Sequence, residues 1–192
     1  MKKIICMILF FPLPLSAQGY FGFGWDTTFT AGYRISSDTS FGVKLPARVH
    51  TAGADEYLDS LGIHSHDQNG TNGWEFGVYT YSGGNPNSRV YLDTLTYAAN
   101  NTMERLIMPV DFDMTEGVTY TICANSLGPW STRPDVGINS WTAAVSLDTH
   151  SVLQNTWVHY FTFNSYFAIF AHYSIREAPP EPSMLTPVMK EP

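Results

Sequence analysis

The sequence contains no sustained helical spacing of apolar residues and is divided instead into short alternating segments. No stretch keeps a 3.6-residue apolar period over three turns. By contrast, Trp74, Phe76 and Val78 fall on one side of an extended chain over residues 74–81. Comparable segments, separated by turn-forming residues, are 20–29, 56–64, 90–97, 106–113, 118–124 and 157–175. This pattern predicts an all-β fold, an antiparallel β-sandwich of the jelly-roll type.

Proline, glycine and asparagine indicate where these segments end. Residues 82–87 are rich in turn formers and predict a loop. Pro109 cannot donate a ladder hydrogen bond, so its strand is expected to lie at a sheet edge or to carry a bulge. A long loop is expected over residues 125–138. Residues 157–175 predict a closing hairpin that breaks at Asn164–Ser165.

The N-terminal segment has the parts of a secretory signal peptide. Lys2 and Lys3 precede about a dozen apolar residues, too few to span a membrane, and small residues follow. We expect residues 1–17 to be a cleaved leader, residues 18–176 a β-sandwich domain, and residues 177–192 a disordered Pro-rich tail. The expected location is secreted, extracellular or at the cell surface, with no transmembrane anchor in the mature chain.

The charge balance excludes some partners. The chain carries 10 Lys and Arg against 17 Asp and Glu, a formal charge of −7, and loss of the two leader lysines makes this −9. Binding to nucleic acid or to anionic membranes depends on clustered positive charge. We therefore expect no nucleic-acid partner.

One cysteine would remain after export. Cys6 lies in the leader, so the mature chain would hold Cys123 alone and could form no internal disulfide. The surrounding strand-like residues favour a buried thiol that acts as a small apolar side chain.

Two parts of the chain carry motifs in a familiar order. Between residues 58 and 125 these are Leu61-Gly62-Ile63, His66-Asp67-Gln68-Asn69-Gly70, Phe76-Gly77-Val78-Tyr79, Ser82-Gly83-Gly84 and Met114-Thr115-Glu116-Gly117-Val118-Thr119-Tyr120. Pro180-Glu181-Pro182-Ser183 follows the last expected strand. This order resembles the β-sandwich ectodomain of exported bacterial proteins of the PEP-CTERM class. In that class a membrane helix and a basic cluster follow Pro-Glu-Pro, and neither appears after Ser183. The resemblance implies a structural or adhesive role, in association with exopolysaccharide.

Metal binding is considered at residues 64–73. His64 and His66 share a face of a strand and, with Asp67, could hold a metal for a hydrolase. No second His/Asp cluster completes the ligand set, so surface histidines are the favoured interpretation. The loop that follows offers Asp67 and Asn69 as calcium ligands. Because Asp67 would be its sole carboxylate, a plain turn without a cofactor is favoured.

Aromatic residues suggest a sugar-binding surface. Trp130 lies in a Gly-Pro loop and, with Trp141 and Tyr81, could stack on pyranose rings. Trp74 and Trp157 lie in alternating segments and are expected in the core.

Together these features predict an exported, non-catalytic β-sandwich with a structural or adhesive role. The expected partners are extracellular polysaccharide or cell-surface components. Two alternatives remain open: a carbohydrate-binding module that uses the loop aromatics, and a metal-dependent hydrolase.

Overall fold

A computed structural model shows the fold. It describes residues 18–25, 32–34, 40–43, 48–67, 72–97, 100–127, 135–148, 153–159 and 161–177. The expected leader, the tail from residue 178 onward, Asn69 and Trp130 lie outside these ranges. For Asp67 and Trp141 only the backbone is described. Within these ranges no helix is long and apolar enough to cross a membrane.

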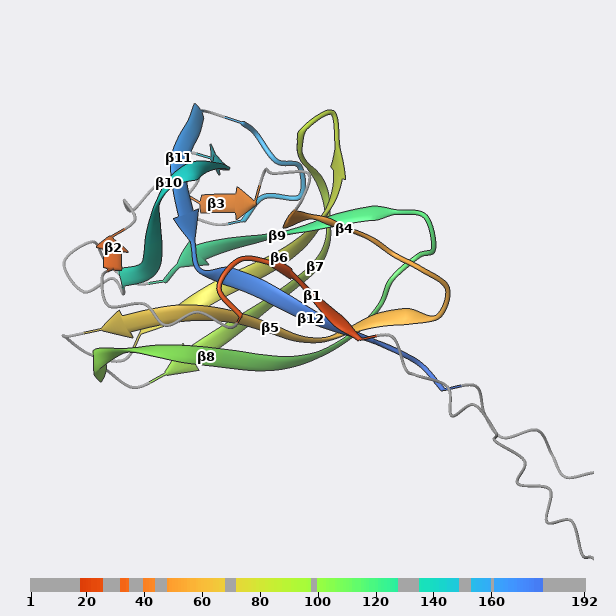
Figure 1. Cartoon of the computed structure of the whole chain (residues 1–192), viewed down its shortest axis with the longest axis horizontal. Coiled ribbons are helices and arrows are strands. Elements are labelled where there is room, and N and C mark those ends of the chain that lie inside the picture. Colours follow the sequence, from red (N-terminus) through yellow and green to blue (C-terminus); the bar gives the residue numbers. More distant parts are fainter. Residues whose placement is uncertain are drawn as a thin grey trace, which may run out of the picture.

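Antiparallel strands form two sheets packed face to face (Figure 1). Sheet A contains β1 (Gly19–Gly22), β12 (Ile169–Ile175), β5 (Glu56–Asp67) and β8 (Asn100–Asp113), with β2 (Gly32–Arg34) at one end. Sheet B contains β11 (Phe161–Phe167), β10 (Asp135–Asp148), β3 (Ser40–Val43), β9 (Thr119–Ser126), β6 (Asn72–Ser82), β7 (Asn85–Tyr97) and β4 (His50–Thr51). The predicted all-β antiparallel sandwich is confirmed.

The core lies between the two sheets and is built by alternation. Trp74, Phe76 and Val78 on β6 are all fully buried, as their spacing predicts. Trp74 packs edge-on against Phe41, with ring centroids 6.0 Å apart, and its indole N–H donates to Ser65 Oγ at 2.9 Å. This bond satisfies the one polar atom that the indole brings into the core.

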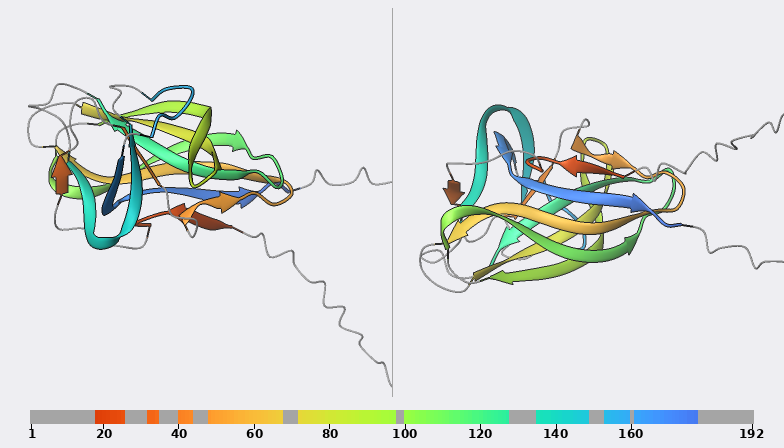
Figure 2. Two further views of the ribbon diagram at one scale, coloured as in Figure 1. Left: turned by 90° about the horizontal axis from the view of Figure 1, so that it is seen from above. Right: turned by 60° about the horizontal axis from the view of Figure 1, so that its bottom comes forward.

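Strand β10 connects the sheets and was not predicted. Its first residues pair with β2 and β5 in sheet A, and its later residues with β3 and β11 in sheet B. Figure 2 shows its sharp bend. Apolar residues fall at even positions up to Ile138 and at odd positions from Trp141, and the register shifts between Ser140 and Ala144. The expected loop over residues 125–138 is therefore wrong at both ends. Residues 125 and 126 belong to β9, and from Asp135 onward the chain belongs to β10, where the bulge hides the alternation.

The expected closing hairpin is also wrong. Asn164 and Ser165 lie inside β11, opposite the irregular part of β10, and do not form a turn. Strand β11 pairs with β10, whereas β12 pairs with β1 and β5. The chain thus passes from one sheet to the other at Ala168. The polar pair marks an irregularity in strand pairing, not a chain reversal.

Two other predictions of strand boundaries agree more closely with the structure. The loop at residues 82–87 is real but shorter: Gly83 (φ 58°) and Gly84 (φ 82°) make a two-residue turn, and residues 85–87 belong to β7. Pro109 lies in β8, which pairs with β5 at the edge of sheet A and has a register shift next to Ser60. Its placement agrees with the prediction of an edge strand or bulge.

Residues 153–159 cover the outer side of sheet B. Leu153 and Trp157 pack there against Tyr79 and Cys123. The backbone N–H of Leu153 donates to Glu75 Oε2 at 2.7 Å. Cys123 is fully buried and Trp157 is 6 % exposed, which confirms both as buried residues, although Trp157 lies in an irregular segment and not in a strand.

Candidate functional site

Residues Tyr20–Trp25 form an arch over the outer face of sheet A, and we call this segment the arch. It begins in β1 and then turns through Gly22 (φ 87°) and Gly24 (φ 102°). These backbone angles favour glycine. A Cβ on Gly22 would also lie 2.4 Å from the carbonyl oxygen of Ile169. The amide of Phe23 donates to that same oxygen at 2.7 Å, which holds the arch close to β12.

His64 anchors the far end of the arch. Its Nε2–H donates to the carbonyl oxygen of Gly24 at 2.8 Å, and the side chain is 6 % exposed. The expectation of a surface histidine is therefore wrong for His64. Burial lowers the pKa of His64, the Gly24 bond opposes this shift, and the charge of Arg105 adds to it. Across the described ranges, no group of three His, Cys, Asp or Glu residues could hold a metal ion.

We predict that His64 makes the arch sensitive to mild acid. Because its pKa is lower in the folded chain than the ordinary 6.5, the folded state favours neutral imidazole. The stabilising contribution is complete above pH 6.5 and is lost as pH falls through the folded-state pKa. Urea unfolding between pH 8 and pH 5 should show a smaller loss of stability in H64Q than in the wild type. The exposed-site variant H159Q should keep the wild-type slope, and an unchanged slope in H64Q would contradict this role.

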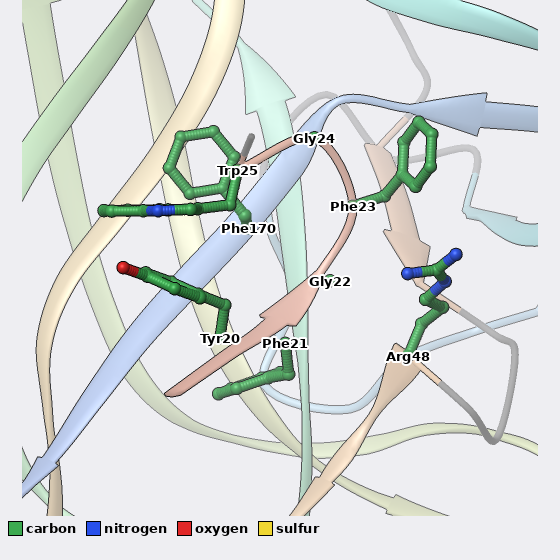
Figure 3. A pocket seen from close by; sticks show the side chains of 8 residues that line it. All are labelled: Tyr20, Phe21, Gly22, Phe23, Gly24, Trp25, Arg48 and Phe170. Carbon is green, nitrogen blue, oxygen red and sulfur yellow. The ribbon is translucent and has the colours of Figure 1, made fainter. Parts of the chain in front are cut away.

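Tyr20 and Trp25 bring the two ends of the arch together. Their rings stack with centroids 4.0 Å apart at 24°. Trp25 meets Phe170 edge-on at 5.1 Å, and Figure 3 shows the three rings together. Phe170 is buried beneath Trp25, whereas Tyr20 remains 47 % exposed. The result is an aromatic surface whose outermost ring is open to solvent and whose inner rings are fixed.

His172 lies beside this aromatic pair and is oriented by Asp59. Its ring centroid is 4.7 Å from that of Tyr20, and its Nδ1 is 2.6 Å from Asp59 Oδ2. Ser174 and Ser60 also donate to Asp59, at 2.7 and 2.9 Å. Burial raises the pKa of Asp59, but the hydrogen bonds from Ser174, His172 and Ser60 together outweigh it, so the pKa lies below the usual 3.8. With Nδ1 committed to Asp59, the Nε2 atom of His172 has no hydrogen-bond partner among the described residues.

Two arginines flank the arch. The Arg105 guanidinium lies 5.0 Å from the Trp25 ring centroid, and its Nη1 donates to the Trp25 carbonyl at 3.2 Å. Arg48 lies 5.3 Å from the ring centroid of Phe23. The arch, Arg48 and Phe170 line a pocket of about 290 Å³, in which Arg48 is the charged member (Figure 3). This volume is just below the usual range for small-molecule sites.

Of the aromatic candidates from the sequence, Tyr81 and Trp141 fall in described strands. Tyr81 is near the end of β6 in sheet B, opposite Pro86, and burial raises its pKa. Trp141 lies in the irregular part of β10, at residues 141–143. Asp67 is the last residue of β5. Nothing in the described part of the chain places these residues at the arch, and they stay as predictions.

Sequence reasoning missed Tyr20 and Trp25. Residues 20–29 are aromatic and glycine-rich, and the sequence predicts an ordinary strand there. The available signal was the pair Gly22 and Gly24 between aromatic residues, since glycines inside a strand indicate a bend or close backbone approach. His172 and Asp59 gave no signal, because 113 positions separate them in the sequence.

These features define an antiparallel β-sandwich with an aromatic arch on one outer face. No protein-family model and no curated protein matches the sequence. Among solved structures, the chain is similar to the clostridial cysteine protease Cwp84 after propeptide cleavage, with 11 % identity and a TM-score of 0.53. The match covers 83 % of this chain and 40 % of Cwp84, so the chain spans less than half the length of that protein. At this identity the likeness concerns the fold.

A second structure shows part of the same protein. It contains the cysteine protease and lectin-like domains of Cwp84, a surface layer associated protein of Clostridium difficile. That match has 11 % identity and a TM-score of 0.48, and covers 72 % of this chain and 32 % of the other.

Proposed function

We propose that this chain is an exported, non-catalytic β-sandwich that binds glycans through the arch. The ligand would be extracellular polysaccharide or a glycan of the cell surface. The location is proposed from the leader-like residues 1–17. The observation that carries the binding proposal is the stacked pair of Tyr20 and Trp25, with Tyr20 47 % exposed.

The chemistry of the arch supports a sugar ligand. An exposed aromatic ring suits the apolar face of a pyranose, and polar groups at its edge suit the hydroxyls. Tyr20 supplies the ring, and His172, held by Asp59, supplies a fixed polar group beside it. Trp25 is packed on Phe170 and so holds Tyr20 in place before a ligand arrives. Preorganisation of this kind lowers the entropic cost of binding.

Substitution of Tyr20 tests the proposal. The chain without residues 1–17 would be screened on a glycan array, and the best ligands measured by isothermal titration calorimetry. We expect Y20A to weaken binding about tenfold, as loss of a stacking ring should. Near-UV circular dichroism would check that Y20A keeps its fold. The proposal is wrong if no glycan binds or if Y20A binds as tightly as the wild type.

The same measurement separates the arch from the loop aromatics. W130A, W141A and Y81A remove the rings that the alternative carbohydrate-binding site would use. If the arch binds the glycan, all three variants should keep wild-type affinity. Loss of binding in W130A with none in Y20A would favour the alternative. We propose no cofactor, so a chelator should leave binding unchanged, whereas a calcium site at Asp67 and Asn69 would make binding chelator-sensitive.

A further inference from the structure

We propose that the glycan recognised at the arch is acidic, with a uronic-acid carboxylate that binds Arg105. This inference rests on the proposed glycan-binding function and names the class of sugar. Arg105 is held against Trp25 by one hydrogen bond and by the face of the ring. A guanidinium has five N–H donors, and this contact uses one of them. The remaining donors of Arg105 have no protein acceptor in the described part of the chain.

The charges around Arg105 leave room for an external anion. No carboxylate among the described residues forms an ion pair with it. Glu104 is its neighbour on β8, and adjacent strand residues point to opposite faces of a sheet. Asp59 is already bonded by His172 and two serines. A carboxylate from a ligand would thus complete the charge pairing at this position.

Arg176 is a useful comparison for Arg105, because it also lies over an aromatic ring but has a structural role. It lies over the Tyr57 ring at 4.3 Å, much as Arg105 lies over Trp25. Arg176, however, is paired with both Asp111 and Asp113. In a chain with seven more acidic than basic residues, Arg105 is unusual as a stacked arginine that has no such partner among the described residues. Arg105 and Arg176 therefore differ in their carboxylate partners and not in their contact with an aromatic ring.

Arg48 adds positive charge beside Phe23, in the middle of the arch. It lines the pocket that Tyr20, Trp25 and Phe23 also line. His64 contributes no further charge near neutral pH, because burial lowers its pKa. One guanidinium, that of Arg105, thus lies against the Trp25 ring, and the other, that of Arg48, lies against the Phe23 ring. This arrangement fits a sugar ring that carries carboxylates, since guanidinium and carboxylate match in geometry and charge.

The test compares an acid with its own ester. Oligogalacturonate, oligoglucuronate and oligomannuronate would each be titrated beside the fully methyl-esterified form, which keeps the pyranose rings and removes the charge. We expect at least one acid to bind about tenfold more tightly than its ester, and added salt to reduce the difference. The R105Q variant should lose this preference, so that it binds the acid no more tightly than the ester. The R176Q variant loses the same charge at a remote position and should keep the wild-type preference.

The outcomes separate this inference from the proposed function. If acid and ester bind equally in the wild type and Y20A weakens both, the ligand class is wrong and glycan binding stands. If R105Q lowers affinity for acid and ester alike, Arg105 merely positions Trp25 and the inference is overturned. If none of the acids binds while neutral glycans do, the inference also fails. R105K keeps the charge without the forked geometry, so a partial preference there supports a direct contact with the carboxylate.

Discussion

Replacing Trp74 with alanine should destabilise this protein by about 3–5 kcal/mol, as the loss of a large buried aromatic side chain commonly does. Trp74 has no exposed surface, packs against Phe41, and donates its N–H to Ser65. The variant would leave a cavity between the sheets and a buried hydroxyl without its donor. Domains of this size are stable by about 5–15 kcal/mol, so a large part of the total would be lost. Urea unfolding followed by far-UV circular dichroism measures the change.

A milder variant separates the two contributions. W74F keeps an aromatic ring and removes the donor to Ser65, so it should cost less than W74A. The exposed-residue variant V158A is the control and should stay within about 0.5 kcal/mol of the wild type. A W74A protein as stable as the wild type would mean that the sheets do not pack around this indole.

Adding one methyl group at Gly62 should both destabilise the fold and weaken glycan binding. A Cβ there would lie 2.3 Å from the ring of Phe170 and 2.8 Å from the carbonyl oxygen of Leu106. Overpacking of this kind costs about 1–3 kcal/mol. Because Phe170 supports Trp25, its displacement should also move the aromatic pair of the arch. We expect G62A to lower both the free energy of unfolding and the affinity for the glycan that Tyr20 binds.

A second substitution checks this mechanism. The new methyl group at position 62 would clash with ring atoms of Phe170. Leucine at position 170 lacks these atoms. G62A/F170L should therefore be less destabilised than the sum of the two single variants, by about 1 kcal/mol. Strict additivity would show that the methyl group acts elsewhere, for example through the Leu106 carbonyl. G83A is a useful comparison, since nothing lies within 4 Å of its Cβ and its cost should come from the positive φ alone.

Much of the sandwich could be predicted because burial on a strand is local. Trp74, Phe76 and Val78 recur at every second position, and one face of β6 is buried for that reason. Errors arose where pairing is irregular. The alternation of β10 changes phase at its bulge, and Asn164–Ser165 faces that bulge, so a strand was missed there and a turn was wrongly placed.

The arch shows a second limit of prediction from the sequence. Its aromatic residues are close together in the sequence, but the residues that fix their positions are distant. His64 bonds to Gly24 across 40 positions, and Asp59 bonds to His172 across 113 positions. The sequence predicted Trp130, Trp141 and Tyr81 as the aromatic site because loop position was the available guide. No local sequence pattern predicts that the chain after β1 will turn back over Phe170 and stack Trp25 on Tyr20.

The amino-acid sequence was thus enough to establish the fold class, the buried face of β6 and the buried state of Cys123, because each depends on side chains spaced along one strand. The strand order, the crossing of β10 between sheets and the arch were decided by tertiary structure. They depend on which edges pair and on contacts between distant residues, whose free energies appear only when the two sheets have come together.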